Sequence, residues 1–269
     1  MSECTHDCSA CGQDCKERSD PQKPQLNKFS KVKKLYAVMS AKGGVGKSMV
    51  TAQLAVLTRR KGKTVAVLDA DVTGASMTKY FGIKEKALAN DKGILPAQSA
   101  TGIKLVSMNM FLQDENSPVI WRSSLSTGAV TQFWTDAYWG DVDTMFIDMP
   151  PGTGDIPLTV YQNLPIDGIV MVTTPQELVE TIVAKGVNMA KMLNIPIIAI
   201  VENMSYYQCD KCGEKLNIFG KSNVDSTASK LGIKDVAKIP ITPILSAACD
   251  NGAIEYFDGD WLGNIVDKL

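Results

Sequence analysis

A glycine-rich loop at residues 40–48, SAKGGVGKS, carries the clearest chemistry in this sequence. It follows an apolar run and opens a segment with helical spacing, which is the setting that a phosphate-binding P-loop needs. Glycines let backbone N–H groups turn toward phosphate oxygens, while Lys47 reaches the β- and γ-phosphates and the Ser48 hydroxyl binds Mg²⁺. Ala41 replaces the first glycine of the strict motif, and a plain glycine-rich turn is the alternative. We predict that ATP and Mg²⁺ bind here, through Gly43, Gly44, Val45, Gly46, Lys47, Ser48 and Met49.

Three aspartates stand at or just after the ends of two apolar runs, in VLDADVTG and FIDMPPGTGD. Parallel strands of a doubly wound sheet end at one edge, and ligands bind there. We therefore expect Asp69, Asp71 and Asp148 beside the glycine-rich loop, where a phosphoryl-transfer site needs carboxylates. Asp148 has the position of a Walker B carboxylate that binds Mg²⁺ through water, and Gly152 and Gly154 permit a mobile switch loop after it.

The elements that must position these residues alternate between strands and helices. Helical spacing of apolar residues occurs at 47–61 and 178–193. Strand-like apolar runs lie at residues 35–40, 65–69, 145–148, 169–173 and 197–201. Near-continuous apolar strands separated by helices indicate a parallel sheet covered on both faces. We predict a three-layer α/β fold, a P-loop NTPase with a mostly parallel central sheet between helices.

Composition favours one large domain after a short leading segment. The 269 residues are 45% hydrophobic and 21% charged, which suffices for a sizeable core. The formal net charge of -1 indicates neither a nucleic-acid nor a membrane partner. Residues 1–34 are polar and begin with clustered cysteines, so we expect a flexible segment and tether before an NTPase domain at 35–269. The first residues lack the pattern of a secretory signal, which favours a cytoplasmic location.

The segment KGGVGK contains a second lysine, Lys42, and resembles the deviant Walker motif. This motif occurs in septum-positioning and chromosome-partition ATPases and in the nitrogenase iron protein. There the corresponding lysine crosses a two-fold interface to the other protomer's nucleotide, so the resemblance implies a homodimer. A cation supplied in trans would neutralise charge on the transferred phosphoryl group. The resemblance also implies that Asp71 orients the attacking water and that Asp69 lies nearer the metal shell. A solvated surface lysine is the alternative for Lys42.

The segment ENMSYYQCDKCGEKLNIFG extends the resemblance from the deviant Walker superfamily to one family within it. Together with DMPPGTGD and KGGVGKS, it is similar to the Mrp/ApbC family of ATP-binding iron–sulfur cluster carriers over residues 35–269. The resemblance implies that Asn203 contacts the adenine and that Cys209 and Cys212 bind a cluster. Two thiolates cannot complete a four-coordinate site, whereas two copies across a two-fold axis supply four. We therefore favour a [4Fe-4S] cluster shared between two chains.

Zinc is the alternative ligand of this pair, because the surrounding residues also resemble a zinc ribbon. In one version, Cys8 and Cys11 of the same chain would complete the zinc site. A second set of cysteines, spaced C-x3-C-x2-C-x3-C, has enough thiolates for its own [4Fe-4S] cluster or for zinc, and His6 could replace one of them. This set consists of Cys4, Cys8, Cys11 and Cys15. The remaining Cys249 is expected to be a free buried cysteine.

The leading hypothesis for function is a slow P-loop ATPase that carries an iron–sulfur cluster. It would accept the cluster at the homodimer interface and transfer it to apo-proteins, from a donor that the sequence does not identify. ATP binding and hydrolysis would reshape that interface. Two alternatives remain open: a dimeric partition or positioning ATPase with structural zinc, and an ATP-dependent electron donor with a fixed cluster.

Overall fold

The computed structural model describes residues 23–71, 74, 76–111, 123–152, 154–175 and 179–269. The predicted ligands Cys4, Cys8, Cys11 and Cys15 lie outside these residues, as does His6. The second cluster site therefore stays a prediction.

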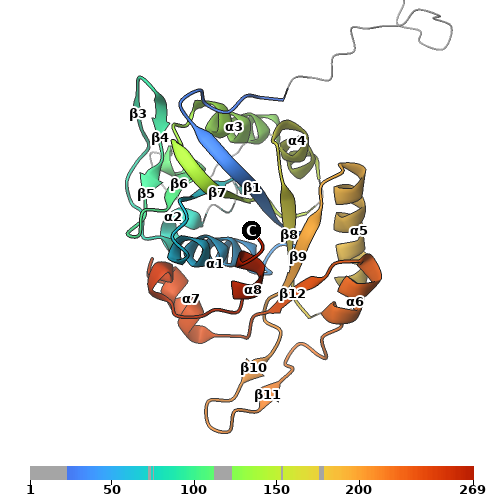
Figure 1. The fold of residues 1–269 in the computed structure, drawn as a ribbon. Helices are drawn as coiled ribbons and strands as arrows, with labels where there is room; N and C mark the ends of the chain where they lie inside the picture. Colours follow the sequence, from blue (N-terminus) through green and yellow to red (C-terminus); the bar gives the residue numbers. More distant parts are fainter. Residues whose placement is uncertain (1–22, 72–73, 75, 112–122, 153, 176–178) are drawn as a thin grey trace, which may run out of the picture.

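One large sheet forms the centre of the protein (Figure 1). Within the described residues it has eight strands, in the order β12-β9-β8-β1-β7-β2-β6-β5. Neighbouring strands are parallel, except that β5 pairs antiparallel with β6. The strands are β1 (Lys31–Ser40), β2 (Val65–Asp69), β5 (Ala97–Gln98), β6 (Lys104–Ser107), β7 (Asp141–Asp148), β8 (Gly168–Thr173), β9 (Ile197–Glu202) and β12 (Asp235–Lys238). The predicted mostly parallel α/β sheet is confirmed.

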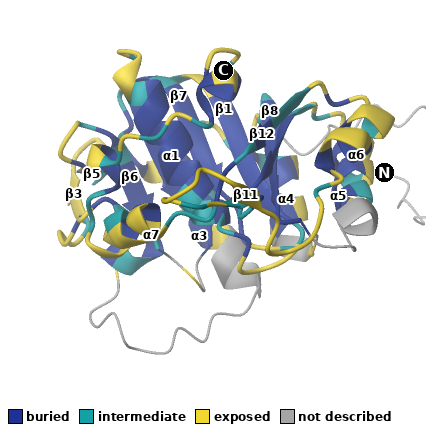
Figure 2. Ribbon diagram, turned by 90° about the horizontal axis from the view of Figure 1, so that it is seen from below, coloured by how far each residue is buried: buried dark blue, intermediate teal, exposed yellow. Residues whose placement is uncertain are grey.

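The central strands are apolar on both faces because helices cover both. Every residue of β2 and β8 is buried, and Figure 2 shows the sheet as the buried layer between partly exposed helices. The register also aligns the strand ends. Asp148 at the end of β7 pairs with Val38 of β1 on one side and with Asp69 of β2 on the other. Two of the predicted carboxylates therefore lie at the edge where β1 leads into the glycine-rich loop.

Two hydrophobic clusters lie between the sheet and its helices. One packs beneath α3 (Ser123–Asp136), α4 (Asp155–Asn163), α5 (Val179–Met192) and α6 (Val224–Leu231). The other packs beneath α1 (Lys47–Arg60), α2 (Met77–Tyr80), α7 (Pro243–Asp250), α8 (Gly263–Val266) and the short 3-10 helix η2 (Ile254–Tyr256). A further 3-10 turn, η1 (Met108–Met110), follows β6. Among helices of the described residues, none has the length and apolarity to cross a bilayer.

Two antiparallel hairpins extend from this core. The first pairs β3 (Leu88–Asn90) with β4 (Gly93–Leu95). The second pairs β10 (Tyr207–Gln208) with β11 (Lys215–Leu216), and Figure 1 shows it projecting away from the sheet below β12. The second hairpin contains the C-x-x-C pair, so the predicted metal ligands sit on an arm outside the core.

Ordered structure begins before Leu35, where we expected the folded domain to start. The strand β1 already begins at Lys31, and its first half carries lysines that pair with carboxylates, such as Lys33 with Asp143 at 2.5 Å. Further upstream, Trp134 Nε1 donates to Pro24 O at 3.1 Å. The expected tether at 1–34 is therefore too long at its C-terminal end, because its charged residues form the solvated start of a strand.

Candidate functional site

The loop between β1 and α1 bends through two glycines in the left-handed region. Gly44 and Gly46 have φ angles of 79° and 83°, and Gly46 is the N-cap of α1. A Cβ atom at Gly46 would lie closer to Asn203 Nδ2 than van der Waals contact allows. The same Asn203 Nδ2 donates to Val45 O at 2.9 Å. This bend presents the N-terminus of a 14-residue helix to the predicted phosphates, which is the electropositive end of its dipole.

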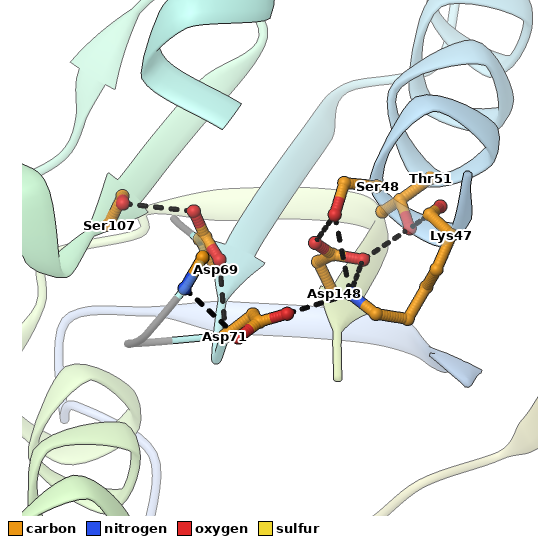
Figure 3. Close-up of polar contacts among 8 residues, drawn as sticks. Lys47, Ser48, Thr51, Asp69, Asp71, Ser107 and Asp148 are labelled. Atoms are coloured by element: carbon orange, nitrogen blue, oxygen red, sulfur yellow. Dashed lines mark hydrogen bonds and ion pairs between the residues drawn. The ribbon is translucent and has the colours of Figure 1, made fainter. Parts of the chain in front are cut away.

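Lys47 and Asp148 form the centre of a buried polar network (Figure 3). Lys47 Nζ lies 2.7 Å from Asp148 Oδ1, and the two residues are 6% and 0% exposed. Ser48 Oγ donates to Asp148 Oδ2 at 2.5 Å. A hydroxyl and a carboxylate side by side are hard oxygen donors of the kind that Mg²⁺ prefers, so these residues fit the metal predicted from the sequence. The structure brings the P-loop and the predicted Walker B carboxylate together as expected.

Asp69 belongs to the same network and is as fully buried as Asp148. Its Oδ1 accepts from the Asp71 N–H at 3.2 Å, and its Oδ2 accepts from Ser107 Oγ at 3.0 Å. Burial, reinforced by the nearby negative charge of Asp148, raises the pKa of Asp69 to about 7, although Lys47 opposes the shift. Burial also raises the pKa of Asp148, again against Lys47. Asp69 therefore titrates near neutral pH rather than as an ordinary carboxylate.

Asp71 lies inside the buried network, whereas Lys42 lies at the protein surface. Asp71 Oδ2 lies 3.6 Å from Lys47 Nζ, and Figure 3 shows Asp71 between Asp69 and Lys47, with dashed lines toward both. A carboxylate this close to Lys47 fits the predicted role of orienting a water beside the phosphate. Lys42 is exposed at the start of the loop, where its side chain is accessible to another chain. Both roles remain predictions.

Two residues with hydroxyl groups in the site were not identified from the sequence motifs. Thr51 Oγ1 lies 2.9 Å from Asp148 Oδ1 and 3.0 Å from Lys47 O. Ser107 ends β6 directly opposite Asp69 and bonds its carboxylate. Thr51 could have been found, because it stands one helical turn after Lys47 on the same face of α1. Ser107 could not, because its neighbour in the sheet depends on the strand order.

A cavity of about 260 Å³ opens beside the loop. Its lining combines apolar side chains such as Met49 and Leu245 with the amide of Asn203, which is 2% exposed. A pocket with apolar walls and one fixed amide suits a nucleotide base. The predicted contact of Asn203 with adenine thus has a cavity to occur in. Cys249 on α7 also borders this cavity and is buried, as expected, and its burial raises the pKa of the thiol to about 11.

The C-x-x-C pair lies at the turn of the β10–β11 hairpin. Cys209 N donates to Glu214 O at 2.9 Å, and Gly213 N donates back to Cys209 O at 2.8 Å. Gly213 has a φ of 73°, which permits the tight turn. The backbone N–H groups of Cys212 and Lys211 face the Cys209 sulfur and lower the pKa of its thiol. The turn therefore favours the thiolate form, which is the form that binds metals.

Among the described residues, the hairpin of one chain does not supply the ligands of a complete metal site. Cys209 is half-buried and Cys212 is exposed. Across the residues that the structure describes, no group of three or more His, Cys, Asp or Glu side chains could hold a metal ion. The described part of a single chain thus offers two thiolates at an exposed turn, as the sequence suggested.

Residues 31–260 match the sequence model of the ParA family described as NUBPL iron-transfer P-loop NTPase. A Clostridium perfringens protein named iron-sulfur cluster carrier protein is 42% identical over 260 residues, or 93% of this chain and 90% of the relative. The nucleotide-binding protein of Archaeoglobus fulgidus, solved in complex with ADP, has a TM-score of 0.79 and 40% identity, covering 86% of this chain and 91% of that one. The MinC:MinD cell division protein complex of Aquifex aeolicus, at TM-score 0.61, 17% identity and coverage of 87% and 93%, shares the fold. The chain belongs to the Mrp/NUBPL-type family of iron–sulfur cluster carriers, within the ParA/MinD-like P-loop NTPases.

Proposed function

We propose that this protein is an ATP-dependent carrier that holds a [4Fe-4S] cluster between the Cys209 and Cys212 pairs of a homodimer and transfers it to apo-proteins. The observation that carries the proposal is an exposed C-x-x-C turn on the same domain as a P-loop whose Lys47 and Ser48 both contact Asp148. An exposed turn suits a cluster that must leave, because an acceptor's thiolates can approach it. The name of the Clostridium perfringens relative supports the same cargo.

Hydrolysis would use the network around Lys47. The loop N–H groups and Lys47 bind the β- and γ-phosphates, while Ser48 and, through water, Asp148 hold Mg²⁺. Mg²⁺ would neutralise negative charge on the phosphate oxygens. Asp71 orients the attacking water, and Lys42 from each protomer reaches the other protomer's nucleotide. The buried Lys47–Asp148 pair at 2.7 Å supports this assignment, because it places the lysine for the phosphates beside the carboxylate for Mg²⁺.

A dimer supplies the two further thiolates that the hairpin of one chain lacks. Two thiolates from each protomer give the four ligands of a [4Fe-4S] cluster. The cysteines at residues 4–15 would hold a second cluster, so any measurement of iron must separate the two sites. The pair and the amino-terminal set can be changed independently.

Anaerobic reconstitution of four proteins tests the cargo: the parent, C209A/C212A, a variant with serine at Cys4, Cys8, Cys11 and Cys15, and the combination. We expect the serine variant to keep about one cluster per two chains, with the visible absorption and reduced-state EPR of [4Fe-4S], and to elute as a dimer. The combined variant should bind no iron. Stoichiometric zinc and no cluster in the serine variant would contradict the proposal.

Transfer of labelled iron from the loaded protein to an apo-acceptor tests the role of ATP. Lys47→Ala should leave reconstitution unchanged, because it removes no thiolate, and should abolish the acceleration of transfer by ATP. Undiminished transfer by this variant would show that cluster delivery does not depend on ATP bound at Lys47. Retention of the label by the parent, with reduction of the acceptor, would instead indicate an electron donor.

A further inference from the structure

A buried carboxylate lies at the base of the cysteine hairpin. Glu202 ends β9 and is 1% exposed, and its carboxylate accepts hydrogen bonds from Ser205 Oγ at 2.5 Å and Ser222 Oγ at 2.9 Å. A carboxylate removed from water is unfavourable unless it is hydrogen-bonded, so these hydroxyls keep it in place. Ser205 precedes β10 and Ser222 follows β11. Glu202 therefore fastens both ends of the segment that carries Cys209 and Cys212.

The hairpin has little other support. Residues 210–221 are all exposed, and Figure 2 shows β11 and its connections among the exposed parts of the surface. Backbone hydrogen bonds attach the hairpin to the core at its base, for example from Ile241 N to Tyr206 O at 2.7 Å. Because so few buried contacts hold the arm, its orientation depends on the residues at its base.

The residues at this base also contact the nucleotide site. Asn203 follows Glu202 directly, and its side chain donates to Val45 O in the P-loop. Asn203 and Met204 both line the 260 Å³ cavity. Met204 has a φ of 56°, a left-handed turn that leads the chain from the cavity to Ser205. Residues 202–205 therefore contact the P-loop on one side and the hairpin on the other.

We propose that Glu202 is a positioning residue that couples nucleotide binding at the P-loop to the orientation of the cysteine hairpin. Nucleotide that contacts the Asn203 amide in the cavity shifts residues 202–205. The Glu202 carboxylate then moves both ends of the hairpin together, through Ser205 and Ser222. This coupling rests on the carrier function proposed above and adds the route by which ATP reaches the thiolates. It is a contiguous set of contacts between two sites, through which coupling of this kind can be carried.

Hydrogen exchange of the metal-free protein, with and without Mg²⁺ and the non-hydrolysable analogue AMPPNP, tests the coupling. In the parent, amides of residues 206–221 should exchange at rates that depend on the nucleotide. In Glu202→Ala, that dependence should disappear, and these amides should exchange about tenfold faster in both states. Glu202→Gln should restore the parental dependence, because its amide can pair with both serine hydroxyls.

The chain offers a matched control in Glu255. It is 6% exposed and accepts hydrogen bonds from Ser99 Oγ at 2.6 Å and from Thr101 Oγ1, away from the hairpin. Glu255→Ala should lower stability in a comparable way and leave the nucleotide dependence of the hairpin intact. If Glu202→Ala does not fold, Ser222→Ala removes one of the two anchoring bonds and should reduce the dependence.

Two results would overturn the coupling. One is a parental protein in which AMPPNP protects the P-loop amides but does not change the exchange rates of the hairpin amides. The other is a folded Glu202→Ala variant that keeps the full parental dependence. Neither result involves a cluster, so failure of the carrier function in reconstitution is a separate outcome.

Discussion

Asp69 shows how a single buried residue makes the site sensitive to pH. Its pKa rises from the ordinary 3.8 to about 7 on folding, chiefly through burial. Between pH 3.8 and about 7 the folded state therefore binds more protons than the unfolded state. The contribution of protonated Asp69 to the free energy of unfolding is fully present below pH 3.8 and is lost as pH rises through 7. We expect the nucleotide-free protein to lose stability across this window, with a slope approaching about 1.4 kcal/mol per pH unit.

Denaturant unfolding at a series of pH values measures this slope, and Asp69→Asn provides the comparison. An asparagine can accept from the Asp71 N–H and donate to Ser107 Oγ, so it mimics the protonated carboxyl without titrating. The variant should have a shallower pH dependence and be more stable than the parent above pH 7. Equal slopes in the two proteins would mean that Asp69 does not titrate in this range.

At the scale of elements, the sequence predicts structure best where a short segment determines its own backbone geometry. The loop at residues 42–48 could be identified because glycines, lysine and serine at fixed spacing define a P-loop. The parallel sheet followed from apolar strands between helices. The strand order did not follow, which is why Ser107 was missed. The base of the hairpin was missed for a related reason, since Glu202 and Ser222 meet only after β9, β10 and β11 have formed.

The P-loop element also yields a prediction from Gly46. Alanine there must adopt a φ near 83° and displace Asn203, which breaks its hydrogen bond to Val45 O. The left-handed conformation costs about 1–2 kcal/mol, and the lost bond adds about 1 kcal/mol. The matched control is Gly62→Ala, since Gly62 has a φ of 82° and no atom near its Cβ position.

Calorimetric titration with ATP and unfolding in denaturant measure the two effects. Gly46→Ala should bind ATP at least about tenfold more weakly and be less stable than Gly62→Ala, which should bind ATP like the parent. Equal stability of the two variants would show that Asn203 moves aside without loss, and would weaken its role as a fixed contact of the loop.

At the scale of the whole molecule, the unit of function is predicted to be two chains, and mixing variants tests this directly. If Lys42 acts in trans, each active site combines Asp71 of one protomer with Lys42 of the other. K42A and D71N should each be inactive as homodimers. A K42A/D71N mixed dimer should recover one site, because the K42A protomer keeps its Asp71 and receives Lys42 from the D71N protomer. Random pairing at equal amounts then restores about a quarter of parental ATP hydrolysis.

The same mixture separates the trans lysine from a lysine that acts within its own chain. A lysine acting in cis would leave both sites of the mixed dimer defective, and the mixture would stay inactive. Lys42 is exposed, so its substitution should leave the fold and the buried Lys47–Asp148 pair unchanged, which circular dichroism and ATP binding by each variant check. Because the C-x-x-C turn also offers only two thiolates per chain, recovery of hydrolysis and assembly of the cluster should require the same pairing of protomers. A mixture that hydrolyses ATP without forming dimers would contradict that shared requirement.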